Sequence, residues 1–270
     1  PIGAAVTDGY NAGHGLPFDS EGMKERYPDI FFSQFTGAEL VADKWNLSRE
    51  DLDQFALESH QKAAQATESK YFDKEILPVE GKNAEGINDL VMADEGIRFD
   101  ASLDKLAGLN PVTEGGKITA GNASQITDGA AAVLICNDAG LKKIKSNPRA
   151  EIVSISVVGD DPVFMLTGPI PASHKALEIA KLSIDDMDIY EVNEAFAPVP
   201  LAWAEELKAD RSKLNVNGGA MALGHPLGAT GAKLMTTMLH ELERRKGKYA
   251  LQAICEGGGT ANATIIKRVS

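Results

Sequence analysis

Cysteine is scarce in this sequence, and no long apolar run occurs in it. The chain includes two cysteines, Cys136 and Cys255, and neither belongs to a CxxC pair. A disulfide framework or a zinc site is therefore not expected, and we predict no metal cofactor. The longest apolar runs fall far short of the roughly 18 residues that a membrane-spanning helix needs. These shortages predict a globular protein without a membrane partner.

Basic residues are few relative to acidic ones. Lysine and arginine number 27, aspartate and glutamate 39, and the formal net charge is −12. This balance argues against a nucleic-acid partner, which needs a basic surface. It leaves a phosphorylated ligand open, because a local basic patch can lie on an acidic protein.

The ends of the sequence bear on where the protein is found. No signal peptide and no C-terminal peroxisomal signal is visible, so we expect a cytoplasmic protein. The sequence opens at Pro1, without methionine and in the style of a loop interior. We therefore expect further residues before it, which leaves N-terminal targeting undecided.

The first part of the sequence predicts mainly helix and loop. Residues 1–30 are rich in Gly, Pro, Asp and Asn and are predicted as loop. Residues 33–67 predict two helices, the second starting at the N-cap pattern of Ser48 and Asp51. Short strands and loops follow, and then a short helix within residues 99–112.

The later part predicts a layered α/β unit. The run GAAAVLIC, residues 129–136, has the length and composition of a strand buried on both faces, and Cys136 at its end is interpreted as a small buried hydrophobe. Strands and helices alternate after a boundary near residues 145–150, which is typical of helices layered on a sheet. The predicted strands are 151–161, 186–196, 214–219, 249–259 and 261–269, and the predicted helices are 171–182, 199–207 and 229–247.

One stretch places five glycines around a histidine. It reads NVNGGAMALGHPLGATGA, residues 215–232, between a predicted strand and a predicted helix. It is not a P-loop, because no lysine follows, and not a dinucleotide fingerprint, because Pro226 stands where the second glycine belongs. Glycines let a ligand or another backbone approach closely. The stretch predicts a turn that presents His225, and a histidine that only satisfies a turn is the open alternative.

Two other predicted strands end in chemically useful residues. Asn193 follows an apolar strand in EVNEAFA, and Cys255 precedes three glycines in CEGGGTANA. A thiol before a run of bare N–H groups suits a nucleophile or an acid/base beside an oxyanion site. Asn193 could instead cap a helix, and Cys255 could be buried and inert. If the strand ends share one edge of the sheet, Asn193, His225 and Cys255 form one constellation.

These motifs, in this order and spacing, resemble the thiolase family over essentially the whole chain. NEAF, the histidine stretch and CEGGGTANATII resemble the C-terminal lobe, GNASQITDGAAAVL the end of the N-terminal lobe, and SQFTGAELVADKWNLSREDLDQFALESHQKAA the loop domain. The resemblance implies an α/β fold with a layered α/β/α lobe, an α-rich loop domain and a remnant of the N-terminal lobe. The implied domains are 1–115 for the loop domain, 116–147 for the N-terminal remnant and 148–270 for the C-terminal lobe.

The resemblance also implies an activity, that of an acyl-CoA C-acyltransferase working through an acyl-cysteine. His225 would take the proton of the nucleophilic cysteine and, with a water fixed by Asn193, hold a thioester oxygen. Cys255 would be the acid/base that moves the α-carbon proton. The N–H of Gly257 would serve the oxyanion hole of the acyl-enzyme. Coenzyme A and acyl-CoA are then substrates, and no permanently bound cofactor is expected.

The substrate contacts follow from the same resemblance. Ser124 and Ala120 would touch the pantetheine arm of coenzyme A, and Phe196 and Met165 would line the acyl end. Met165 could equally be plain core, since most methionines are.

The chain departs from the family pattern just before the first predicted helix of the loop domain. Family members often carry His-Met there, and this chain has Ser33 and Gln34. The departure puts one coenzyme A contact in doubt and is compatible with a different or bulkier acyl group.

The resemblance places the nucleophilic cysteine of thiolases before the region where this chain starts. Cys136 lacks the expected Ser-Gly neighbourhood, so we expect the chain to lack its nucleophile and to be inactive alone. We expect the parent protein to be a homo-oligomer, either a dimer or a tetramer. A non-catalytic thiolase-like module that binds acyl-CoA or a partner subunit is the alternative function, and a nucleotide-dependent dehydrogenase is a more distant one.

Overall fold

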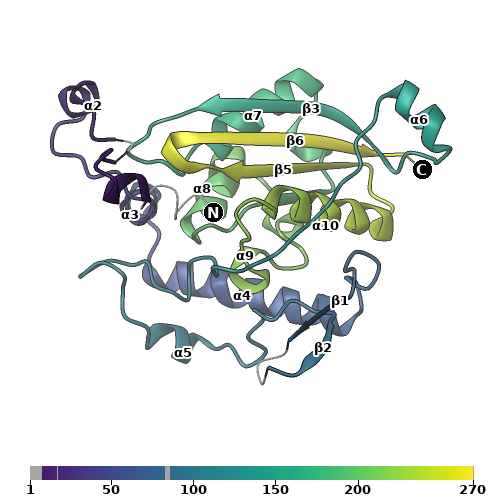
Figure 1. Ribbon diagram of the computed structural model, residues 1–270, viewed down its shortest axis with the longest axis horizontal. Coiled ribbons are helices and arrows are strands. Elements are labelled where there is room, and N and C mark those ends of the chain that lie inside the picture. Colours follow the sequence, from purple (N-terminus) through teal and green to yellow (C-terminus); the bar gives the residue numbers. More distant parts are fainter. Residues whose placement is uncertain (1–7, 17, 83–85, 270) are drawn as a thin grey trace.

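A four-stranded sheet forms the centre of the later part of the chain (Figure 1). The structure is a computed structural model that describes residues 8–16, 18–82 and 86–269. The strand order is β3-β6-β5-β4; β4 runs parallel to β5, and β6 is antiparallel to β5 and β3. The strands are β3 (Ala150–Gly159), β4 (Ile189–Val192), β5 (Tyr249–Cys255) and β6 (Thr260–Arg268).

Helices cover the two faces of this sheet because neighbouring strand residues point to opposite sides. In β4, Tyr190 packs in the main core on the α7 side, whereas Ile189 packs with Met238 and Leu242 of α10. The result is the α/β/α layering that the resemblance implied. The helices of this lobe are α6 (Asp138–Ile144), α7 (Pro169–Ala180), α8 (Pro198–Leu207), α9 (Ala220–Leu223) and α10 (Thr230–Arg245).

The earlier part of the chain is mainly helical. In Figure 1, its elements α4, α5, β1 and β2 lie below the sheet, whereas α2 and α3 lie at the left end of the sheet. Its longest helix, α4, starts at a capping box in which the Ser48 and Asp51 side chains each bond the other's backbone N–H, as predicted. Residues 1–30 are not all loop, because α2 forms within them, and residues 1–7 and 17 lie outside the described ones. The elements are α2 (Glu21–Arg26), α3 (Gln34–Lys44), α4 (Arg49–Glu68), β1 (Val79–Lys82), β2 (Asn88–Val91) and α5 (Leu103–Ala107).

The prediction of a buried strand at 129–136 is wrong. This segment has no regular structure, and Leu134 is 77% exposed. Cys136 is exposed as well, so its interpretation as a buried hydrophobe is also wrong. An apolar run becomes a strand only beside another strand, and within the described parts of the chain none pairs with it.

The predicted strand at 214–219 is absent for a different reason. Only isolated bridges form, at Leu214 and between Val216 and Gly218. The Asn215 side chain takes the place of a strand partner: its Oδ1 accepts the N–H of Val192 at 2.9 Å and its Nδ2 donates to the Val192 carbonyl at 2.9 Å. The segment therefore joins the edge of β4 mainly through the Asn215 side chain, together with one backbone bond from the Asn215 N–H to the Tyr190 carbonyl at 2.9 Å.

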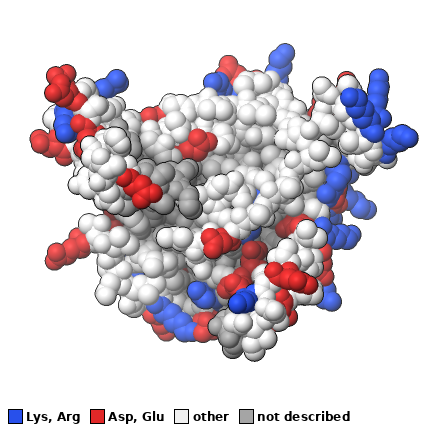
Figure 2. Space-filling view, in the orientation of Figure 1, with Lys and Arg blue, Asp and Glu red and all other residues white. Residues whose placement is uncertain are grey.

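The outer face of β3 is apolar and uncovered. Ile152, Ile155 and Val157 of this edge strand are exposed. Figure 2 shows the charged side chains gathered around the rim of this view, with the middle largely uncharged.

None of the helices in the described parts of the chain is long and apolar enough to cross a membrane.

Candidate active site

The carboxyl ends of the parallel strands β4 and β5 lie side by side, as predicted. Asn193 directly follows β4, and its N–H donates to the Ala253 carbonyl of β5 at 3.0 Å. Cys255 is the last residue of β5. In α/β sheets, ligands bind at this carboxyl edge. Asn193 and Cys255 thus begin a site at the expected place.

His225 lies on the loop between α9 and α10, and not at the end of a strand. Gly224 before it has φ 81°, and a Cβ there would lie 2.5 Å from a side-chain carbon of Thr127, so only glycine fits. The first turn of α10 is fixed over β5, because the Gln252 side chain donates to the Gly231 carbonyl at 2.7 Å. The loop that holds His225 is therefore anchored, through the start of α10, to Gln252 of β5.

Residues 122–125 join the two loops of the site. On one side, the Ser124 N–H donates to the Ala195 carbonyl at 2.9 Å, and the Ala197 N–H donates to the Asn122 carbonyl at 2.9 Å. On the other side, the His225 N–H donates to the Gln125 carbonyl at 3.0 Å. Ser124 thus lies on a segment that is hydrogen-bonded to both the Asn193 loop and the His225 loop.

Gln125 was missed in the sequence. Its side-chain amide donates to the carbonyls of Gly96 at 2.8 Å and Met221 at 2.7 Å, which ties residues 122–125 to α9. The partners are far away in the sequence, so no local pattern indicates them.

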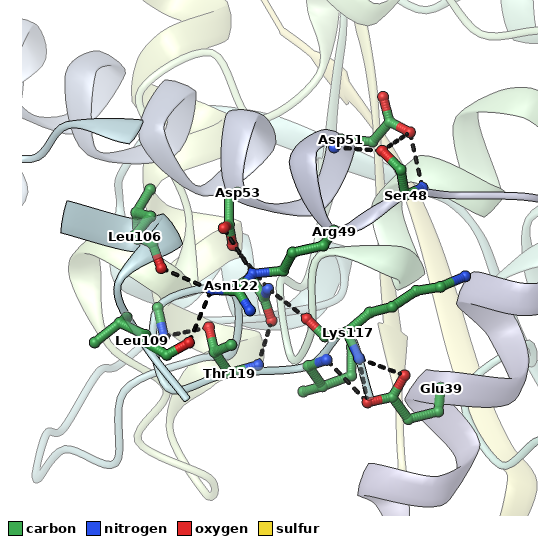
Figure 3. A network of polar contacts seen from close by, with 12 residues as sticks. Glu39, Ser48, Arg49, Asp51, Asp53, Leu106, Leu109, Lys117, Thr119 and Asn122 are labelled. Atoms are coloured by element: carbon green, nitrogen blue, oxygen red, sulfur yellow. Dashed lines mark hydrogen bonds and ion pairs between the residues drawn. The ribbon is translucent and has the colours of Figure 1, made fainter. Parts of the chain in front are cut away.

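A buried polar network holds residues 117–122 against α3 and α4 (Figure 3). The Asn122 Nδ2 donates to Asp53 Oδ1 at 2.9 Å, and its Oδ1 accepts the N–H of Thr119 at 2.8 Å. Asp53 also accepts Arg49 Nε at 2.7 Å. Because these groups are satisfied, the turn that precedes Ser124 is rigid. Ala120 lies exposed on this turn.

A second buried hub centres on Glu194, the residue after Asn193. Its carboxylate accepts Ser59 Oγ at 2.7 Å, Asn215 Nδ2 at 2.8 Å and the Met221 N–H at 3.1 Å. These partners come from α4, the segment beside β4, and α9. Glu194 therefore fixes the loop of Asn193 to the helix that leads to His225, a positioning role that the motif NEAF alone did not indicate.

Gly219→Ala is expected to destabilise the protein through this hub. A Cβ on Gly219 would lie 2.2 Å from Glu194 Cδ, and the buried carboxylate could move away only by breaking the hydrogen bonds that hold it. Overpacking combined with a broken buried network should lower the free energy of unfolding by about 3 kcal/mol. Chemical denaturation measures it. Gly22→Ala is the matched control, because a Cβ there meets nothing within 4 Å; equal stability of both variants would contradict the role of the hub.

Burial sets the protonation of the two titratable side chains. It raises the pKa of the Cys255 thiol to about 12, so this group is protonated at neutral pH. It lowers the pKa of His225, so the imidazole is neutral at neutral pH. The site thus offers a neutral base and a protonated thiol that can deliver a proton.

The two cysteines should differ in reactivity. At pH 8, iodoacetamide is expected to modify exposed Cys136 at least about 100-fold faster than Cys255, because Cys255 is buried and almost never a thiolate there. Mass spectrometry of peptides over time measures both rates, and denatured protein serves as the control in which they converge. Similar rates in the folded protein would contradict the buried, protonated Cys255.

Asn193 has an unusual surrounding. Its side chain is 1% exposed, and neither Nδ2 nor Oδ1 has a hydrogen-bond partner among the described residues. Buried amides are almost always satisfied by protein or ordered water. The unpaired amide therefore indicates a place for a water or a ligand atom at the strand edge.

Gly257 and the two predicted acyl contacts flank this edge. Gly257 is exposed just after Cys255, and a Cβ there would meet nothing within 4 Å. Phe196 is buried edge-on against Phe35 of α3, with 5.5 Å between ring centroids. Met165 is buried beside α3, next to the Phe164 carbonyl that closely approaches Gly37.

Ser33 has a structural role at the start of α3. Ser33 is the N-cap of α3, where its hydroxyl accepts the N–H of Phe35, so serine here has a structural reason. Within the described parts of the chain, no group of three His, Cys, Asp or Glu residues could hold a metal ion.

The chain matches two family descriptions in series. Residues 17–139 match "Thiolase, N-terminal domain" and residues 146–268 match "Thiolase, C-terminal domain". Among solved structures, human mitochondrial 3-ketoacyl-CoA thiolase aligns with a TM-score of 0.84 at 45% identity, over 87% of this chain and 59% of that one. Its complex with CoA aligns with a TM-score of 0.80 at 44% identity, over 87% of this chain and 58% of that one.

Comparison with relatives of known name points to the same family. The chain is 53% identical to steroid 3-ketoacyl-CoA thiolase of Mycobacterium tuberculosis, over 100% of this chain and 65% of the relative. It is 41% identical to acetyl-CoA acetyltransferase of Paracoccus denitrificans, over 99% of this chain and 69% of the relative. The chain thus spans about two thirds of the length of these relatives. With both family domains matched in the expected order, the chain belongs to the thiolase family.

Proposed function

We propose that this chain carries the acid/base half of the active site of an acyl-CoA C-acyltransferase, a thiolase. The observation that carries the proposal is the unpaired, buried Asn193 amide at the same sheet edge as Cys255, whose thiol is protonated. Buried amides are normally paired with protein groups or with water, so the Asn193 side chain has capacity to bind a water or a ligand atom. Ser124 and Ala120, on the segment beside Asn193, are the proposed contacts of the pantetheine arm.

The proposed reaction, written in the cleavage direction, gives each group a separate role. His225 accepts the proton of a nucleophilic thiol, whose sulfur attacks the 3-keto carbon of a 3-ketoacyl-CoA. The bond between C2 and C3 breaks, and Cys255 gives its proton to C2, which leaves as acetyl-CoA. The Cys255 thiolate then takes the proton of an incoming CoA thiol, and the CoA sulfur attacks the acyl carbon. The bond between that carbon and the nucleophilic sulfur breaks, and the departing thiolate takes back the proton held by His225. The Gly257 N–H stabilises the oxyanion of the acyl-cysteine, a donor typically worth about 3–4 kcal/mol.

The nucleophilic thiol of this scheme is not one of the two cysteines in the chain. Cys255 is the protonated acid, and Cys136 is exposed at the end of the segment 129–136, just before the N-cap of α6. We therefore propose that residues outside the 270 supply it, and that the 270 residues alone do not catalyse thiolysis. The exposed apolar face of β3 supports association of the protein as a homo-oligomer. The cytoplasmic location stays a prediction.

We further propose a ring-bearing acyl group. The M. tuberculosis relative that matches all of this chain is named for steroid substrates. Next to α3 lies a hollow of about 360 Å³, within the size range of small-molecule sites, in which the Phe18 and Phe32 rings stack at 4.6 Å. Its lining is mostly apolar, with the charged residues Asp19 and Lys24 as exceptions, and suits a hydrocarbon ring system. The residues around it are Leu16, Phe18, Asp19, Met23, Lys24, Tyr27, Ile30, Phe31 and Phe32.

Thiolysis by the full-length protein tests both parts. We expect cleavage of 3-ketoacyl-CoAs by CoA, with a higher kcat/KM for a ring-bearing acyl group than for a linear one of similar size. Binding of acyl-CoA without any turnover would reject the enzyme and favour the non-catalytic module. Turnover with a preference for linear chains would reject only the proposed acyl group.

A further inference from the structure

A buried threonine touches the proposed base. Thr230, the first residue of α10, is 2% exposed, and its Oγ1 lies 2.6 Å from His225 Nδ1. The same oxygen lies 3.0 Å from the Pro226 carbonyl. That carbonyl also accepts the N–H groups of Ala229 at 2.8 Å and Thr230 at 2.9 Å, so its position is fixed. One hydroxyl thus bridges a ring nitrogen and a fixed acceptor.

Counting protons decides the direction of these bonds. A hydroxyl carries one proton, and a carbonyl oxygen can only accept. If the Thr230 proton points to the Pro226 carbonyl, Oγ1 must accept a proton from Nδ1. If the proton points to Nδ1, the contact with Pro226 is no hydrogen bond at all. Only the first arrangement makes both contacts hydrogen bonds.

From this geometry we propose that Thr230 is a positioning residue that holds the proton of His225 on Nδ1 and leaves the lone pair of Nε2 as the base. No residue that the structure describes is hydrogen-bonded to Nε2, so this atom is the one available to a substrate or a nucleophilic thiol. When Nε2 gains a proton, the Nδ1–H to Thr230 bond persists and stabilises the imidazolium. This last consequence rests on the proposed function, whereas the tautomer itself does not.

The tautomer can be read without turnover. In ¹⁵N-labelled full-length protein near pH 8, wild type and Thr230→Ser should show His225 with Nδ1 protonated and Nε2 unprotonated. Thr230→Val keeps the shape of the side chain, removes the hydroxyl, and should shift His225 toward the Nε2–H form. The His225 signals are identified by their loss in His225→Gln. An Nε2–H tautomer in wild type, or an unchanged tautomer in Thr230→Val, would overturn the proposal.

Kinetics give the second readout. Thr230→Val should slow acylation by about 10- to 100-fold through kcat with little change in KM, and move the acidic limb of the pH profile to lower pH. Thr230→Ser should restore the rate to within about threefold, since its hydroxyl can make both bonds. A slow Thr230→Ser with the tautomer of wild type would show that the residue acts through packing and would overturn the positioning role.

The chain offers a matched control on the same helix. Thr236 makes the same type of bond to a carbonyl four residues earlier, Ala232 at 2.8 Å, without contacting His225 through its hydroxyl. Thr236→Val should therefore leave the His225 tautomer and the acylation rate as in wild type. If Thr236→Val slows acylation as much as Thr230→Val, the effect belongs to the helix and the proposal fails.

Discussion

Replacing His225 by alanine in the full-length protein is expected to abolish acyl-enzyme formation, with a loss of about 10³-fold or more in rate. The unactivated thiol would then depend on its own ionisation, and a cysteine with an ordinary pKa is only a few per cent thiolate at pH 7. Mass spectrometry of the intact protein after brief exposure to acetyl-CoA measures the acylated fraction over time.

His174→Ala is the matched control, because His174 is exposed on α7. This variant should acylate as wild type does. Acylation of His225→Ala at a rate near that of wild type would show that another group activates the nucleophile, and the role of His225 would be wrong.

The pH dependence has a definite sign. Burial lowers the pKa of His225 from its ordinary value of 6.5, so the neutral imidazole persists as the pH falls through 6.5. As the pH is lowered, the acylation rate should therefore begin to fall at a lower pH than it would with an exposed histidine as the base. Charging the buried ring also costs the folded state more than the unfolded one, so this residue lowers stability as the pH falls below 6.5.

Replacing Cys255 by serine is expected to separate the two halves of the reaction. Acylation of the nucleophile by acetyl-CoA should remain, because it does not use Cys255. Turnover should fall by about 10²- to 10⁴-fold, because a serine hydroxyl is too weak an acid to replace the thiol as proton shuttle. Trapped acyl-enzyme, seen by mass spectrometry together with lost thiolysis, is the expected result.

Cys136→Ser provides the control for this variant. Cys136 is the other cysteine of the chain, and it is exposed outside regular structure. It should show wild-type acylation and wild-type thiolysis. Normal turnover by Cys255→Ser would refute the assignment of Cys255 as the acid/base.

Much of the fold could be predicted from local patterns in the sequence. The start of α4 depends on two residues three apart, Ser48 and Asp51, and α10 at Thr230–Arg245 closely follows the predicted helix 229–247. Residues 129–136 have an equally clear apolar pattern and yet form no strand. A strand requires a partner elsewhere in the chain, and composition contains no information about whether that partner is present.

In the candidate site, too, the residues marked by local patterns were predicted, and those that depend on distant partners were not. Asn193, His225 and Cys255 were found because glycines and strand ends mark them locally. Gln125 was missed because its bond to the Met221 carbonyl joins residues 96 apart. Thr230 could have been found, since a threonine at the start of a helix and five residues after a histidine can reach its ring. The roles of these residues remain predictions, whereas their positions are set by the fold.

The most direct measurement is to find where the acyl group resides. Full-length protein is exposed to acetyl-CoA, quenched in acid and digested, and the acylated peptide is identified by mass spectrometry. We expect one acyl-cysteine, in a peptide outside the 270 residues, with Cys136 and Cys255 unmodified. An acyl group on Cys255 would contradict the account, because the residue proposed to shuttle protons would then be the nucleophile.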